Sequence, residues 1–285
     1  MAFKEKVRGA IQIVRPELPL AAGVCFVLGE VLALGSFPPL RAIGLGFLCG
    51  LLLSASALIT NDYFDLEVDK INAPKRPLPA GLLSGPEAMI LGLLAGLFGL
   101  AAAWILNPFA LLLSLILWVL GFLYNWKLKT AGLWGNLIVS TNVGATFVLG
   151  SIAVGQIWNP IVWVFGSIAF FFDLAEEIAG DAMDAEGDQQ RASRSIAIVR
   201  GKRAALRLSA VLFGVVVLLS FLPVLQGWLD WLYLAIISLT DILIVIFTVK
   251  LLRSRTPETG RGWMRRLYVC ASLGMLAFLI GSLFA

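Results

Sequence analysis

The sequence lacks histidine altogether, and only 14% of its 285 residues are charged. Histidine is the commonest general base and a common metal ligand, so its absence excludes Ser-His-Asp catalysis and histidine-ligated metal centres. The three cysteines, Cys25, Cys49 and Cys270, lie within apolar segments and lack the spacing of metal ligands or of a disulfide framework. Carboxylates are left as the main groups for chemistry.

Apolar residues are abundant, at 59% of the sequence, and the mean hydropathy is +0.91. Soluble proteins average about 45–50% apolar and about 25% charged residues. The composition therefore predicts an all-α polytopic membrane protein, with nine transmembrane helices around a central cavity, and we expect a single domain over residues 1–285. The expected spans are residues 18–35, 42–64, 86–106, 108–125, 132–154, 159–184, 205–222, 229–249 and 264–284.

The first residues alternate between apolar and basic. Phe3, Val7, Ile11 and Val14 share one helical face, and four Lys and Arg residues lie among them. This pattern predicts a short amphipathic helix on the membrane surface within residues 1–16, with a solvated tail as the alternative. No small-residue cleavage site follows the first apolar run, so we expect no removed signal peptide.

The basic residues are distributed unequally between the two sides of the expected bundle. When the loops are assigned alternately to two sides, only Arg41 of the 22 Lys and Arg residues falls opposite the N-terminus. The positive-inside rule then predicts a cell-membrane protein with its N-terminus and the basic loops in the cytoplasm and its C-terminus outside.

Acidic residues gather where the second span ends. Asn61, Asp65 and Asp69 are spaced four apart and so project from one helical face, directly after the uncharged stretch 42–60. Their mutual repulsion calls for a counter-charge, and oxygen ligands of this kind suit Mg²⁺, which shares its remaining positions with water and phosphate. This stripe is therefore a candidate magnesium site.

The loop that follows cannot be helical and carries positive charge. Pro74, Pro77 and Pro79 exclude a helix, and Lys75 and Arg76 place two cations beside the acidic stripe.

A second acidic stripe ends the sixth expected span. Glu177, Asp181, Asp184 and Asp188 follow 4, 3, 4 spacing, and this end lies on the same side of the membrane as the first stripe. We expect the two stripes to face each other across the cavity and to hold a pair of Mg²⁺ ions on a diphosphate. The cations expected around the phosphoryl oxygens are Lys75, Arg76, Lys127, Lys129, Arg191 and Arg194.

Both the basic residues and the acidic stripes also have interpretations that involve no catalysis. The basic residues taken singly serve topology equally well, and the acidic stripes can be solvated helix ends, although the positive-inside rule gives no reason for carboxylates to gather there. A cation-coupled transporter is the second class of function, but its carboxylates usually lie near the bilayer midplane on broken helices. A purely structural protein explains neither stripe. The segment from Tyr124 to Lys129 is either an interfacial anchor or a substrate contact.

These motifs resemble those of the UbiA superfamily of intramembrane prenyltransferases. The resemblance rests on the run from Asn61 to Asp69, the following segment 72–81, and Asp181-x-x-Asp184-x-Glu186-Gly187-Asp188. It implies Mg²⁺ as cofactor and a prenyl diphosphate held between the stripes. Within the superfamily, the first motif and the Tyr124–Lys129 turn are most similar to the enzymes that make ether lipids. The implied metal ligands are Asn61, Asp65, Asp69, Asp181, Asp184 and Asp188, and the implied catalytic residues are Asp65, Asp69, Asp184 and Asp188.

The chain also departs from the family pattern. Glu176-Glu177 and Gly180-Asp181 stand where the family often has Arg-Glu and Lys-Asp, which removes two cations. The segment 192–197 replaces a usual Gly-x-x-Thr-Leu-Pro, so Arg191 and Arg194 are candidate substitutes as phosphate ligands.

The expected reaction begins with ionisation of the prenyl diphosphate, after which a nucleophile captures the carbocation in a pocket closed to water. Loops near residues 70–80, 125–131 and 189–200 should close over the site. Three basic loops favour a lipophilic acceptor with its own phosphate, a glycerol ether lipid, over an aromatic acid or a chlorophyll-synthase-type acceptor. The expected partners are these substrates and the lipid bilayer, with no nucleic acid and no obligate protein partner.

Overall fold

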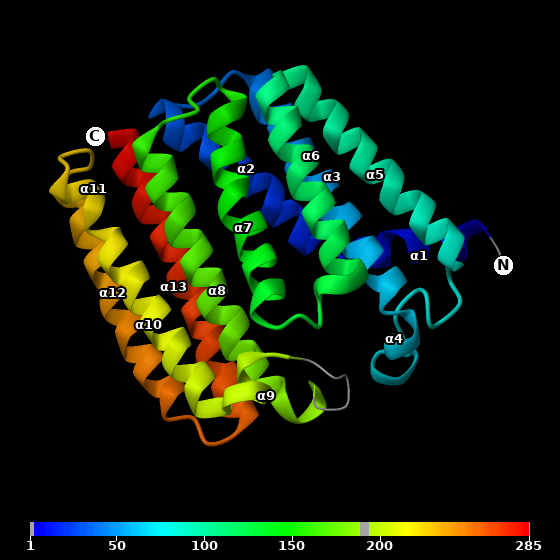
Figure 1. Cartoon of the computed structure of the whole chain (residues 1–285). Coiled ribbons are helices and arrows are strands. Elements are labelled where there is room, and N and C mark those ends of the chain that lie inside the picture. Colours follow the sequence, from blue (N-terminus) through cyan, green and yellow to red (C-terminus); the bar gives the residue numbers. More distant parts are fainter. Residues whose placement is uncertain (1–2, 189–193, 285) are drawn as a thin grey trace.

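The computed structural model describes residues 3–188 and 194–284, and all regular structure in this part of the chain is helical (Figure 1). The all-α prediction is therefore confirmed. The helices are α1 (Phe3–Val14), α2 (Glu17–Leu34), α3 (Leu40–Phe64), α4 (Leu66–Asn72), α5 (Gly85–Leu106), α6 (Pro108–Leu123), the π-helical turn η1 (Tyr124–Leu128), α7 (Leu133–Ala153), α8 (Pro160–Asp188), α9 (Ile196–Arg200), α10 (Lys202–Ser220), α11 (Leu222–Leu225), α12 (Trp231–Leu252) and α13 (Pro257–Phe284).

Eight helices of the described chain are long and apolar enough to cross a membrane, where the sequence predicted nine spans. The remaining predicted span corresponds to α8, which has 29 residues and packs between α7 and α10. Three acidic residues, Asp173, Glu176 and Glu177, interrupt its apolar sequence and set it apart from the other eight. The long helix that acidic residues interrupt is thus the one that carries the second acidic stripe.

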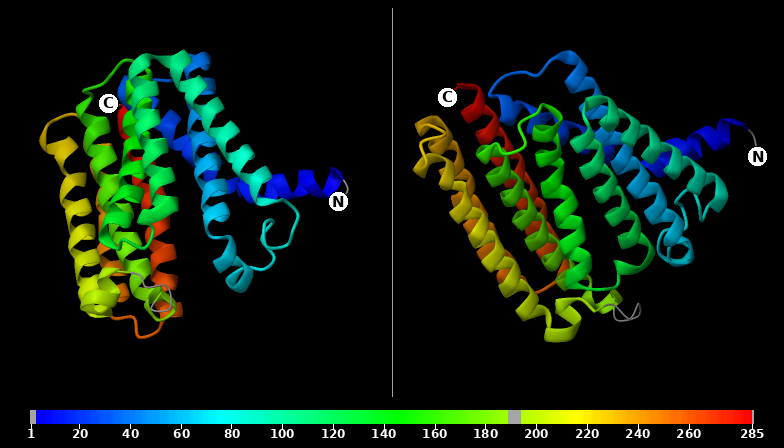
Figure 2. Two further views of the ribbon diagram at one scale, coloured as in Figure 1. Left: turned by 45° about the vertical axis from the view of Figure 1, so that its right-hand side comes forward. Right: turned by 45° about the horizontal axis from the view of Figure 1, so that its top comes forward.

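The long helices run side by side, and the connecting elements divide between the two ends of the bundle. The short helices α4 and α9 lie at the lower end in Figure 1, whereas α11 and the C-terminus lie at the upper end. The N-terminal helix α1 runs across the direction of the long helices, as the left view of Figure 2 shows. Val7 and Ile11 of α1 are exposed and Ile13 is buried; the placement of this helix on a membrane surface stays a prediction.

Glycines let α2 and α7 pack with their backbones in contact. A Cβ atom built on Gly150 of α7 would lie 2.1 Å from the Phe26 carbonyl oxygen, and one on Gly29 of α2 would lie 2.1 Å from that of Phe147. Small residues of this kind are what membrane helices use to approach closely. The close contact places Phe26 of α2 against the cavity described below.

A substitution at this contact tests the packing. We predict that Gly150→Ala lowers the stability by about 1–3 kcal/mol, because the added methyl group must push α2 and α7 apart. Gly44→Ala is the matched control, since nothing lies within 4 Å of its added Cβ, and it should leave the melting temperature in detergent unchanged or slightly raised. Equal melting temperatures for the two variants would contradict the close packing.

Candidate active site

The first acidic stripe keeps its helical register across the break between α3 and α4. The Asp65 amide donates to the Asn61 carbonyl at 2.9 Å, and the Asp69 amide donates to the Asp65 carbonyl at 2.8 Å. The side chains of the stripe nevertheless contact two different basic residues, Lys129 and Arg76. Lys129 forms an ion pair with Asp65, and its Nζ donates to Asn61 Oδ1 at 3.5 Å.

Asp69 belongs to a second group, which is centred on Asp62. Arg76 Nη1 donates to Asp69 Oδ2 at 2.6 Å and lies 3.4 Å from Asp62 Oδ1, and Arg15 Nη2 lies 2.5 Å from the same Asp62 oxygen. Asp62 is only 2% exposed, and a carboxylate so buried needs paired charges and hydrogen bonds. Burial acts to lower the pKa of Arg76, but the hydrogen bond that Arg76 donates to Asp69 and the charges of Asp62 and Asp69 outweigh it, so the pKa of Arg76 is raised.

Sequence reasoning missed Asp62 and Arg15. A signal for Asp62 was present, because it precedes Asp69 by seven residues, two helical turns, and so lies on the same face. Nothing in the local sequence marks Arg15 as its partner, since the pair is 47 residues apart.

The turn η1 positions Lys129 and anchors itself on α3. The Lys129 amide donates to the Tyr124 carbonyl at 2.9 Å, which closes the π-helical turn. Asn125 Nδ2 donates to the Ala57 carbonyl at 2.8 Å and to Thr60 Oγ1 at 3.0 Å. Single π-helical turns occur frequently at functional sites. Asn125 is thus a positioning residue that the sequence pattern did not reveal.

The two lysines of this segment have different surroundings. Lys129 reaches the first stripe, whereas Lys127 is exposed and lies over the Trp126 ring, 4.1 Å from its centroid. The Tyr124 hydroxyl lies in the field of Asp65 from the first stripe and of Glu177 and Asp181 from α8. Tyr124 and Lys129 therefore stand between the two stripes, as the substrate-contact interpretation requires, and Lys127 does not.

The second stripe is also divided, here between α7 and α13. Asn136 of α7 donates from its Nδ2 to Asp181 Oδ2 at 2.9 Å, whereas Asp184 forms an ion pair with Arg261 of α13. Asp173, which accepts a hydrogen bond of 2.8 Å from Ser140, continues the side that faces α7. Asp181 and Asp184 nevertheless line one pocket with Glu176 and Glu177, as their spacing predicted, although their polar partners come from different helices.

The loop after α8 returns to the loop after η1. The Arg194 amide donates to the Thr130 carbonyl at 3.2 Å, and a Cβ on Gly132, whose φ is 62°, would lie 2.0 Å from the Arg194 carbonyl oxygen. The two segments predicted to cover the site therefore touch, while the Arg194 side chain is exposed. The Asp188 side chain and Arg191 lie outside the described part of the structure.

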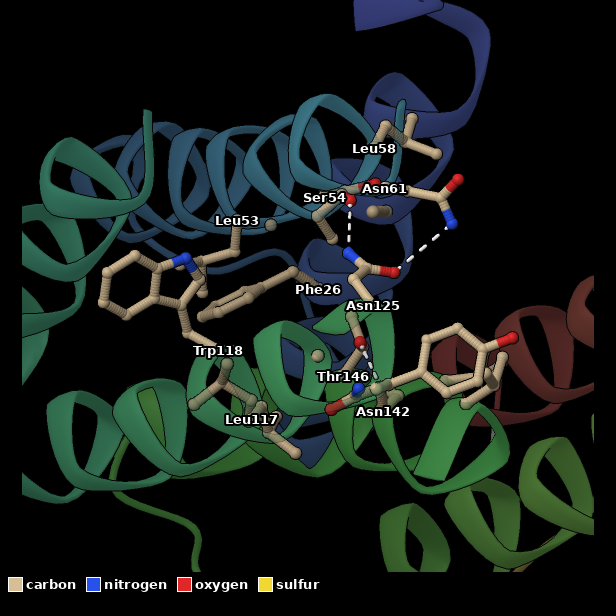
Figure 3. A pocket seen from close by; sticks show the side chains of 18 residues that line it. Phe26, Leu53, Ser54, Leu58, Asn61, Leu117, Trp118, Asn125, Asn142 and Thr146 are labelled. Carbon is tan, nitrogen blue, oxygen red and sulfur yellow. Dashed lines mark hydrogen bonds between the residues drawn. The ribbon is translucent and has the colours of Figure 1, made fainter. Parts of the chain in front are cut away.

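An apolar cavity of about 330 Å³ opens beside the first stripe (Figure 3). Asn61, Tyr124 and Asn125 line one end, and Figure 3 shows the Asn61 and Asn125 amides facing each other across a hydrogen bond of 3.3 Å. Along α3 the lining runs from Asn61 to Gly50, about 16 Å at 1.5 Å per residue, which suits an extended hydrocarbon chain. Trp118 on the wall is fixed by its Nε1, which donates to Ser56 Oγ at 2.9 Å.

The candidate metal ligands are paired with basic side chains in this structure. Among the described residues, no three acidic or cysteine side chains form a ready cation site. Instead Asp65 is paired with Lys129, Asp69 with Arg76, and Asp184 with Arg261. The chemistry of the ligands fits, because carboxylate and amide oxygens suit Mg²⁺, and the Lys129 ammonium already places a positive charge between Asn61 and Asp65. A metal would have to displace these basic side chains.

Comparison with known proteins decides the family. The model of the UbiA prenyltransferase family matches residues 22–280. The chain belongs to the UbiA prenyltransferase family. It is therefore an integral membrane protein of a prenyltransferase family, and the resemblance inferred from the motifs is confirmed.

Individual relatives are similar to this protein over nearly the whole chain. Digeranylgeranylglyceryl phosphate synthase of Thermococcus kodakarensis is 37% identical over 273 residues, which cover 96% of this chain and 97% of that one. The enzyme of the same name from Methanopyrus kandleri is 34% identical, with coverage of 96% and 98%. A solved structure reported for digeranylgeranylglyceryl phosphate synthase in membranes superposes with a TM-score of 0.86 at 26% identity, covering 99% of this chain and 100% of that one.

A more distant structure shares the fold. The UbiA homologue from Archaeoglobus fulgidus, bound to DMAPP and Mg²⁺, has a TM-score of 0.62 at 19% identity and covers 94% of this chain and 98% of that one.

The different surroundings of the two lysines give a test. We predict that Lys129→Gln lowers prenyl transfer at least tenfold, because hydrogen bonds to charged groups contribute about 1.5–3 kcal/mol, and that Lys127→Gln leaves it within twofold. Steady-state rates of the two purified variants, compared at equal amounts of folded protein, measure this. Equal losses in both variants would contradict the placement of Lys129 between the stripes.

Proposed function

We propose that the chain transfers a geranylgeranyl group from geranylgeranyl diphosphate to the hydroxyl of geranylgeranylglyceryl phosphate and releases diphosphate. The observation that carries the proposal is the apolar cavity whose polar end meets Lys129 and the first acidic stripe. The names of the relatives support the choice of acceptor. The whole chain, residues 1–285, acts as one transmembrane prenyltransferase domain.

The acidic stripes are the proposed metal ligands. Asn61 comes from α3, Asp65 from the junction of α3 and α4, and Asp69 from α4. Asp181, Asp184 and Asp188 belong to α8. Bound Mg²⁺ supplies charge neutralisation for the leaving diphosphate. The proposed catalytic residues are Asp65, Asp69, Asp184 and Asp188, and basic residues that now pair with these acids become available to phosphoryl oxygens when the metal binds.

The chain's own groups then position the donor and protect it. Lys129 holds phosphoryl oxygens at the end of the cavity, and Tyr124 donates its hydroxyl hydrogen bond in the same place. The apolar walls hold the prenyl chain and exclude water, and the faces of Tyr124 and Trp118 offer electrostatic stabilisation to positive charge on the chain. The allylic C–O bond breaks, the acceptor oxygen bonds to the freed carbon, and its proton is released with the diphosphate.

Two loops complete the site in this proposal. The contact between Thr130 and Arg194 joins the segment after η1 to the segment after α8, and both lie where they can close over the bound diphosphate. Arg191 and Arg194 remain candidate ligands of the diphosphate, whereas Lys75 and Arg76 remain candidate substrate-binding residues whose substrate is considered below. The N-terminus and these loops are proposed to be cytoplasmic and the C-terminus outside, on the strength of the distribution of Lys and Arg.

Product analysis tests the proposal. Purified protein in detergent receives Mg²⁺ and geranylgeranyl diphosphate with either geranylgeranylglyceryl phosphate or 4-hydroxybenzoate, and mass spectrometry identifies the products. We predict digeranylgeranylglyceryl phosphate, no product after chelation of the metal, and at least a 100-fold loss for Asp65→Asn, with Glu67→Gln as the matched acidic control that stays active. Glu67 is an exposed residue of α4 paired with Lys70.

Three other results of these assays would contradict parts of the proposed function. Prenylation of the aromatic acid alone would make the lipid acceptor wrong and leave the family reaction in place. A requirement for sealed vesicles and an ion gradient would favour the transporter instead. Full activity of Asp65→Asn would remove the first stripe from the mechanism.

A further inference from the structure

A second cavity, of about 460 Å³, lies beside the same end of α3. It shares no lining residue with the apolar cavity of Figure 3. Asn61 faces the apolar cavity and Asp62 faces the second one, as expected for consecutive helical residues about 100° apart. The lining residues of the second cavity are Gln12, Arg15, Asp62, Asn72, Ala73, Pro74, Lys75, Arg76 and Pro77.

The lining of the second cavity is strongly basic and rich in free hydrogen-bond donors. Arg15, Lys75 and Arg76 face a single carboxylate, Asp62, which is buried beneath them. Arg15 Nε is buried and has no hydrogen-bond acceptor. Within the described residues, Lys75 has no hydrogen-bond or ion-pair partner either. Such an excess of donors is suited to an anionic ligand with several oxygens.

The backbone holds Arg15 in an unusual conformation that directs it into this cavity. Its φ is 48°, the left-handed region that residues with a Cβ atom rarely adopt. The conformation turns the chain from α1 into α2 and brings the guanidinium to Asp62, at 2.5 Å. Strained backbone that the surrounding structure maintains is typical of binding sites.

The C-terminal end of α1 borders this cavity, because Gln12 lines it. The helix runs across the long helices in Figure 2, and its exposed residues Val7 and Ile11 lie among Lys4 and Arg8. An amphipathic helix of this kind lies at the boundary between headgroups and hydrocarbon. With α1 on the membrane surface, as its sequence pattern predicts, the cavity would lie within reach of the headgroup of a lipid whose chain lies in the bilayer.

We propose that the second cavity binds the phosphate monoester of the acceptor lipid, while the donor diphosphate lies at the end of the apolar cavity near Lys129. This assignment rests on the proposed function, in which both substrates carry phosphate and need separate sites. A phosphate monoester bears close to two negative charges at neutral pH and offers three oxygens, which match two guanidinium groups and a lysine. Arg76 joins the two sites, because it contacts both Asp62 and Asp69.

Steady-state kinetics of two lysine variants can distinguish binding of the acceptor from binding of the donor. Lys75 is exposed, so Lys75→Gln should fold normally, and Lys70→Gln is the matched control because Lys70 does not line the cavity. In phosphatidylcholine nanodiscs, Lys75→Gln should raise the KM for geranylgeranylglyceryl phosphate about tenfold or more, with the KM for geranylgeranyl diphosphate and kcat unchanged. A raised KM for the diphosphate, or no change in either KM, overturns the assignment.

Binding without turnover distinguishes this proposal from the proposed function. Thermal shifts of the wild type are measured with geranylgeranylglyceryl phosphate, with inorganic phosphate, and in nanodiscs containing phosphatidylglycerol. The expected result is a shift with the lipid monoester that Lys75→Gln loses and Lys70→Gln keeps, with a weaker shift from inorganic phosphate. An equal effect of phosphatidylglycerol overturns the assignment in favour of a general anionic-lipid site. If the Lys75-dependent shift occurs but the wild type forms no product, the proposed function fails and the phosphate site stands.

Discussion

The buried carboxylate of Asp62 holds the candidate site together. Arg15, from the junction of α1 and α2, and Arg76, from the loop after α4, both contact it, so three segments of the chain meet at one residue of α3. Removing one partner of a buried ion pair leaves the other charge uncompensated and costs about 3–5 kcal/mol. The surface helix, the acidic stripe and the basic loop therefore depend on the same charge, which lies between the two cavities.

Three further carboxylates of the two stripes each have a basic or polar partner from another segment of the chain. Lys129 balances Asp65, Arg76 balances Asp69, and Asn136 donates to Asp181. These partners keep the acidic residues from repelling one another at the end of the bundle. The same partners are cations suited to phosphate, so the exchange of carboxylates onto a metal would free basic side chains for the substrate.

The sequence predicted the helices well because their signal is local. Each expected span overlaps an observed helix, although α13 begins seven residues before the last expected span. The acidic residues of α8 both interrupt its apolar sequence and are the reason to place chemistry on it. The partners were not predictable, because Arg15 and Asp62 are far apart in the chain and meet only through packing. The choice between Lys127 and Lys129 depends on a π-helical turn, which no spacing rule for an α-helix includes.

In the proposed mechanism, carboxylates of the first stripe and of α8 bind metal together with a diphosphate. Mn²⁺ can replace Mg²⁺ as an observable ion, and electron paramagnetic resonance counts bound Mn²⁺ with and without geranylgeranyl diphosphate. The account predicts tight binding that requires the diphosphate and is lost in Asp65→Ala and in Asp181→Ala, but not in Glu67→Ala. Unchanged Mn²⁺ binding in either of the first two variants would contradict it.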